Sequence, residues 1–148
     1  MKIKKIMLLT ILLSTLSFNL KAQEINDIVV CSGMVIGNAN IDYLIGNEQA
    51  SYDAYRIAYS AEFASTKNIS GSSERFTLRR ESIMEVINSY NNGNYDANLY
   101  EAVVSCYRLL AAVLLKPEIQ KYLMTSEGAQ ETKTVAQQAF EQLKNQYK

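Results

Sequence analysis

The stretch NLYEAVVSCYRLLAAV, residues 98–113, repeats apolar side chains at intervals of four, three, four and three residues, as does the buried face of an α-helix. The repeated positions are Leu99, Val103, Cys106, Leu110 and Val113. Asn98, followed three residues later by Glu101, predicts a capping box at the start of the helix. We therefore expect this segment to form the central helix of the core.

The chain on either side of this helix has the same character. It contains one proline and six glycines, and its apolar residues recur at spacings of three and four. Further helices are expected from Asn26 or Asp27 to about Leu44, from about Glu48 to Ser65, from Ser72 or Ser73 to the turn at 91–94, briefly after Pro117, and from about Gln130 onward. The sequence predicts an all-α fold, a bundle of five to six helices forming a single domain over residues 23–148.

Two of these helices carry patterns that predict how they pack. The first contains Gly33 and Gly37, four residues apart, which permit either close approach of another helix or a groove for a ligand or a partner's side chain. The third has an apolar stripe that we expect to face the core. Its members are Phe76, Ile83, Ile87 and Tyr90.

Cys31 and Cys106 are the two cysteines of the chain. An even cysteine count in an exported protein predicts a disulfide between them. Closing a ring of 75 residues would stabilise the fold by about 4.5 kcal/mol in the loop-entropy model. The alternative is a buried free pair or a sensor thiol, which would need a cation beside the sulfur, and only Arg108 lies close in sequence.

Residues 1–22 have the layout of a secretory signal peptide. Three lysines among the first five residues precede an apolar run over about 6–16, and a more polar stretch ends at Ala22. The apolar run is shorter than the roughly 20 residues that span a membrane. We expect cleavage after Ala22, no membrane insertion afterwards, and a periplasmic or secreted product.

The composition excludes several kinds of chemistry. The chain has no histidine, so neither Ser-His-Asp nor Cys-His catalysis is available. Two cysteines without a CxxC pair exclude a thiolate zinc site, a thioredoxin-type centre and a haem attachment site, and no glycine-rich phosphate loop is present. Loss of residues 1–22 would leave a net charge of about −4, which argues against nucleic-acid binding. We expect no metal and no cofactor.

Three arginines form the first candidate binding site. Arg75 and Arg79 lie four residues apart on the third helix, and Arg80 is adjacent. Guanidinium groups on one face could receive a carboxylate or a phosphate bidentately. The competing interpretation is a solvated face balanced by neighbouring glutamates.

Tyrosines form the second candidate site. The chain contains ten of them, and Tyr52, Tyr55 and Tyr59 share one stripe of the second helix. Tyrosine combines a large apolar ring with a hydroxyl that stays near water, which suits a protein interface. The competing interpretation places the stripe in the core or at its edge.

A catalytic alternative rests on Glu81 followed by Ser82. This pair is similar to the Glu-Ser pair of lytic transglycosylases, and the resemblance, which covers two residues, implies a carboxylate-dependent enzyme acting on cell-wall glycan with Glu81 as the general acid. The second alternative is a structural envelope protein without a specific ligand.

The absence of a strong catalytic constellation favours a non-catalytic function. We expect an exported helical module that binds another protein, as an inhibitor, an immunity factor or a chaperone does. This format is similar to that of small periplasmic immunity proteins and acid-stress chaperones, which are often helical with one disulfide. No motif specific to either family is present in the chain.

Overall fold

The computed structural model describes residues 20–148 and forms a single helical bundle. Over this range it contains six helices and no strand. They are α2 (Leu20–Leu44), α3 (Glu48–Thr66), α4 (Ser72–Asn91), α5 (Ala97–Leu114), α6 (Pro117–Leu123) and α7 (Ser126–Gln146). The predicted all-α bundle is confirmed. The signal peptide expected over residues 1–22 lies outside the described residues, apart from 20–22, which belong to the first turn of α2.

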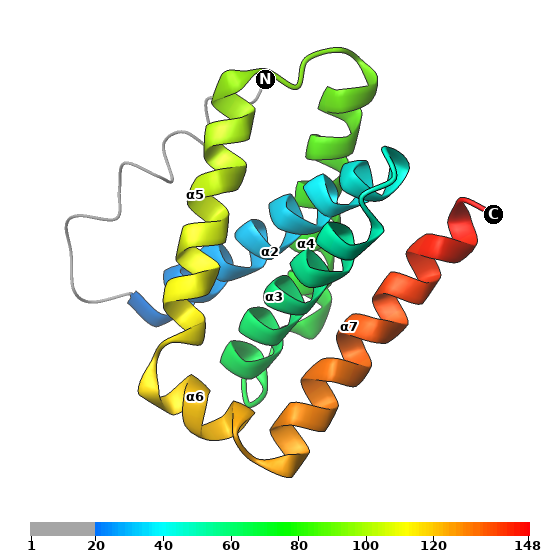
Figure 1. Ribbon diagram of the computed structural model, residues 1–148. Helices are drawn as coiled ribbons and strands as arrows, with labels where there is room; N and C mark the ends of the chain where they lie inside the picture. Colours follow the sequence, from blue (N-terminus) through cyan, green and yellow to red (C-terminus); the bar gives the residue numbers. More distant parts are fainter. Residues whose placement is uncertain (1–19) are drawn as a thin grey trace.

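The helix at the centre of the bundle is α2. It contacts α3, α4 and α5, and it passes behind α5 in Figure 1. Its buried apolar side chains are Ile28, Val29, Met34, Val35, Ile36, Ala39 and Ile41. The prediction that residues 98–113 would occupy the centre is wrong, because α5 buries one face only. Small residues on α2, among them Ser32 and Ala39, let neighbours pack on several of its sides.

Gly33 and Gly37 bring α2 and α4 into close contact. A Cβ added at Gly33 would lie 2.6 Å from the backbone oxygen of Arg79, and one at Gly37 would lie 2.9 Å from that of Ile83. Real Cβ atoms do not approach backbone oxygens so closely, so no side chain fits at either position. The two glycines therefore serve helix packing, and the space beside them is filled rather than hollow.

The contact with α2 sets the orientation of α4. Ser82 and Val86 are buried against α2. The apolar stripe of α4 lies to the side of this contact, so Phe76 is 56% exposed and Tyr90 is 41% exposed. The prediction that the stripe faces the core is wrong for these two residues. The close contact instead uses Ser82, Val86 and backbone atoms of α4.

Several predicted helix starts are displaced. Asn26 and Asp27 lie inside α2 and do not cap it. In α5 the N-cap is Asp96, whose Oδ1 accepts a hydrogen bond from the Leu99 amide at 2.9 Å, so the predicted capping box at Asn98 is wrong. Asp96 has the extended backbone that an N-cap requires.

Two further starts differ from the prediction. α4 begins at Ser72 after Gly71, which has a φ of 87° and takes the N-cap position predicted for a serine. α7 begins four residues before the predicted Gln130, because Thr125 Oγ1 accepts a hydrogen bond from the Gly128 amide at 2.9 Å. Both starts depend on backbone geometry that the apolar pattern does not record.

A disulfide joins Cys31 of α2 to Cys106 of α5, as predicted. The two Cα atoms are 4.7 Å apart, within the range of natural disulfides, and 75 residues separate them in sequence. The bond ties the central helix to the helix at the edge of the bundle. A disulfide is compatible with an oxidising compartment outside the cytoplasm.

Replacing Cys31 and Cys106 together by serine should lower the free energy of unfolding by about 4 kcal/mol, because the unfolded chain is no longer closed into a ring. Urea unfolding followed by circular dichroism measures the loss. As a control, reductant should destabilise the wild type by a similar amount and leave the double variant unchanged. A loss of less than about 1 kcal/mol would show that the ring does not restrict the unfolded chain as this model requires.

Gly37→Ala should destabilise the protein by about 1–3 kcal/mol, because its Cβ would collide with α4. The sign of the effect is diagnostic, since alanine in place of glycine ordinarily stabilises a helix interior by about 1 kcal/mol. Chemical unfolding of the variant beside the wild type gives the difference. A gain in stability would contradict the close contact of α2 with α4.

Candidate functional site

A cleft of about 510 Å³ opens where α3 ends and α4 begins. Val135 of α7 closes one side of it. Its size is within the range of sites that hold small ligands or a few side chains of a partner. The lining residues are Tyr59, Glu62, Phe63, Thr66, Lys67, Ile69, Ser72, Arg75, Phe76, Arg79 and Val135.

Aromatic and aliphatic side chains form much of the cleft wall. Tyr59 and Phe63 come from α3, and Phe76 comes from the start of α4. Phe76 is 56% exposed, and Ile69 in the loop between the two helices is 43% exposed. Large apolar side chains left open to water beside a hollow are typical of a surface that binds something.

A buried ion pair forms the floor of the cleft. Arg79 Nη1 lies 2.5 Å from Glu62 Oε1, and the Glu62 side chain is 6% exposed. The guanidinium also lies near the rings of Tyr59 and Phe76, with its carbon 5.4 and 5.6 Å from their centroids. Arg79 thus connects α4 to α3 through both charge and ring contacts.

The second oxygen of Glu62 has no hydrogen-bond donor among the described residues. Ser32 is close enough to favour the ionised carboxylate, but its hydroxyl donates to the backbone oxygen of Ala58 at 3.2 Å. Burial raises the pKa of Glu62 above its ordinary value, and the Arg79 guanidinium opposes this effect only in part. Ionising Glu62 therefore costs more free energy in the folded protein than in water.

Arg75 is a cleft residue whose guanidinium has hydrogen-bond donors to spare. Its guanidinium donates to the backbone oxygens of Ser70 at 2.5 Å and Ile69 at 2.9 Å. No carboxylate within residues 20–148 forms an ion pair with it. Since a guanidinium has five N–H donors, the two loop contacts orient Arg75 and leave donors for a ligand.

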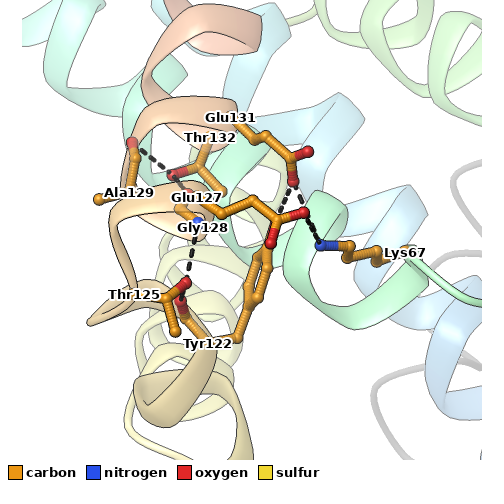
Figure 2. A network of polar contacts seen from close by, with 8 residues as sticks. All are labelled: Lys67, Tyr122, Thr125, Glu127, Gly128, Ala129, Glu131 and Thr132. Atoms are coloured by element: carbon orange, nitrogen blue, oxygen red, sulfur yellow. Dashed lines mark hydrogen bonds and ion pairs between the residues drawn. The ribbon is translucent and has the colours of Figure 1, made fainter.

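Lys67, at the C-terminal end of α3, connects the cleft to α6 and α7. Figure 2 shows its ammonium group reaching Glu127 and Glu131 of α7, with N–O distances of 3.2 and 3.4 Å. The same ammonium lies 4.3 Å from the ring centroid of Tyr122, whose hydroxyl donates to Glu131. Exposed ion pairs contribute little to stability. The main effect of the network is to position the C-terminal end of α3 relative to α7.

The predicted binding residues do not all lie together in the structure. Arg75, Arg79 and Tyr59 meet in the cleft, whereas Arg80 is exposed and outside it. Tyr52 and Tyr55 lie in the core or at its edge, as the competing interpretation had it.

The two core tyrosines join α3 to α7. Their ring centroids lie 5.1 and 5.5 Å from that of Phe140 in α7. The Tyr55 hydroxyl donates to Asn40 Oδ1 at 2.6 Å, and burial raises its pKa. These contacts make Tyr52 and Tyr55 part of the scaffold that positions Tyr59 one turn further along α3.

Glu81, the candidate general acid, lies on the exposed side of α4 and does not line the cleft. Its role as an acid stays a prediction from two residues of sequence. Glu62 is the residue that the sequence analysis missed. It follows Tyr55 and Ala58 at spacings of three and four, which places it on the buried side of α3, and this spacing is a signal that could have identified it.

Within residues 20–148 no group of three His, Cys, Asp or Glu side chains is placed to hold a metal ion. Comparison of the chain with protein-family models, curated proteins and solved structures finds no match. Because a helical bundle by itself does not define an activity, any functional assignment depends on the chemistry of the cleft.

Glu62 should make stability fall as the pH rises. Its folded-state pKa lies above the ordinary value of 4.5, so between the two values the unfolded chain has lost a proton that the folded chain retains. Unfolding is then favoured by raising the pH. Glu62→Gln should reduce this trend without abolishing it, because burial also raises the pKa of Asp27, Asp42 and Glu85. Urea unfolding between about pH 4 and 7 compares the two proteins. A wild type that gains stability over Glu62→Gln across this window would contradict the raised pKa.

Proposed function

We propose that this protein is an exported, non-catalytic binding module whose cleft between α3 and α4 receives an apolar side chain and a neighbouring carboxylate of a partner protein. The observation that carries the proposal is the exposed Phe76 beside the guanidinium of Arg75, which forms no ion pair among the residues that the structure describes. An apolar side chain of the partner would pack on Phe76 and Ile69. Its carboxylate would take the free donors of Arg75.

The rigidity of the cleft supports binding. Nearly all of its lining residues are in helices, and Ile69, in the loop, is fixed by its backbone hydrogen bond to Arg75. The Glu62–Arg79 pair and the Lys67 network hold α3 to α4 and to α7. A preformed site loses less conformational entropy on binding than one that must be ordered.

The charges of the cleft favour binding over catalysis. Its carboxylate, Glu62, is ion-paired with Arg79 and therefore engaged in the fold. Lys67 is neutralised by Glu127 and Glu131, and Arg79 pairs with Glu62, so Arg75 is the cleft cation without an ion pair over residues 20–148. Binding an acidic group at Arg75 requires no rearrangement of these pairs.

Two features support export. Residues 1–22 have the composition of a signal peptide, and the Cys31–Cys106 bridge is of the kind that persists in an oxidising compartment. A partner outside the cytoplasm is what an inhibitor, an immunity factor or a periplasmic chaperone requires.

Photo-crosslinking in intact cells tests the proposal. The photoreactive amino acid p-benzoylphenylalanine replaces Phe76 in one variant and Ile45 in another. Ile45 is a matched control, because it is 59% exposed and precedes the opposite end of α3. We expect irradiation to give one protein adduct from position 76 and none from position 45. Absence of a protein adduct at 76, or the same adducts at both positions, would overturn the proposal.

Arg75→Ala in the position-76 variant should lower the yield of the adduct about fivefold or more, because the partner loses its charged anchor. Arg80→Ala is the control, since Arg80 lies on the same helix but outside the cleft. Thermal unfolding of both variants shows whether they remain folded. Equal losses from the two substitutions would contradict a specific role for Arg75.

A further inference from the structure

The outer face of α5 is unusually apolar for a surface helix. Five of its 18 residues are buried in the bundle, and the other thirteen are alanine, valine, leucine or tyrosine except Asn98, Glu101, Ser105 and Arg108. Tyr100 is 55% exposed, Leu115 just beyond the end of the helix is 75% exposed, and Ala111 and Ala112 are also open to solvent. In Figure 1, α5 lies at one edge of the bundle. Apolar side chains left open to water along one helix favour an interaction site.

Two charged residues interrupt this face, and they have opposite signs. Glu101 and Arg108 are the only charged residues of α5, and both are exposed. They are seven residues apart, which places them on the same side of the helix about 10 Å apart along its axis. Neither forms an ion pair within residues 20–148.

We propose that this face binds the same face of a second copy of the chain, with the two α5 helices antiparallel. A twofold axis placed between Val104 and Ser105 brings Glu101 opposite the partner's Arg108, and Arg108 opposite the partner's Glu101. A single surface then supplies both halves of two ion pairs. This self-complementarity is what a twofold interface requires.

The remaining residues of the face fit the same arrangement. With this axis, Ala97 lies opposite the partner's Ala112, and Tyr100 lies opposite the partner's Leu109, about 3 Å along the axis from the partner's Ala111. The small side chains of Ala97 and Ala112 let the two helices approach to the usual spacing of about 8–10 Å. Tyr100 and Leu109 add apolar contact area between them.

The charges favour a second copy over a lipid bilayer as the cover for this face. Glu101 and Arg108 lie toward the middle of α5, where a charged side chain in hydrocarbon costs about 2.5–3.5 kcal/mol. The opposite face of α5 is packed against the bundle, and Cys106 ties it covalently to α2. The proposed dimer leaves the cleft open, because no residue of α5 lines it. It is therefore independent of the proposed function.

Analytical ultracentrifugation of the purified wild type and its charge variants tests the dimer. We expect a concentration-dependent dimer for the wild type. Glu101→Arg or Arg108→Glu alone should weaken association about tenfold or more, because each places like charges opposite one another. The combined exchange should restore association to within about threefold of the wild type, since the two pairs form again with reversed signs. Lys133→Glu, on an exposed part of α7, should change nothing.

Four outcomes would overturn the proposal. A wild type that stays monomeric at high micromolar concentration would show that α5 does not bind a second copy. A dimer that is insensitive to both single substitutions would place the interface elsewhere. A combined variant that associates no better than the single variants would exclude the antiparallel register. Flotation of the monomer with phosphatidylglycerol vesicles would assign the face to a membrane instead.

Discussion

The close contact between α2 and its neighbours is the constraint on which the fold depends. A helix can be surrounded on several sides only if some of its residues are small enough to let other backbones approach. Gly33 and Gly37 provide this on the side of α4, where added Cβ atoms would collide with backbone oxygens. α2 can therefore serve as the axis of the molecule, while α3 and α5 occupy its other sides.

This constraint also creates the cleft. Because α4 is held to α2, its first turns lie where the α2 contact places them, beside the end of α3 and near Val135 of α7. The space between these elements is only partly filled, and Phe76 is left at its edge. Glu62 and Arg79 fix the width of the space with a buried ion pair, which costs desolvation but specifies a single arrangement of the two helices.

The spacing of apolar residues was enough to predict the helices, and the cysteine count was enough to predict the disulfide. Neither was enough to predict which helix is central. Apolar spacing reports one buried face, as in α5, whereas α2 is recognised by small residues whose effect depends on what packs against them. Capping was ambiguous for a similar reason, since Asp96 and Asn98 are both suitable residues and only backbone geometry selects Asp96. Among the candidate site residues, Arg75 and Arg79 could be found from their spacing. Glu62 was overlooked because a glutamate in a helix is ordinarily exposed to solvent.

The disulfide also divides the chain into two parts with different mechanical freedom. The covalent ring runs from Cys31 to Cys106 and encloses all of α3 and α4, whereas α6 and α7 lie after it. The bond restrains separation of α2 from α5, but it adds no resistance to the detachment of α7, which is retained by its contacts with α3 and α6 and by the packing of Phe140 on Tyr43 of α2. Local opening can therefore begin at the C-terminal segment and expose one wall of the cleft while the ring remains folded.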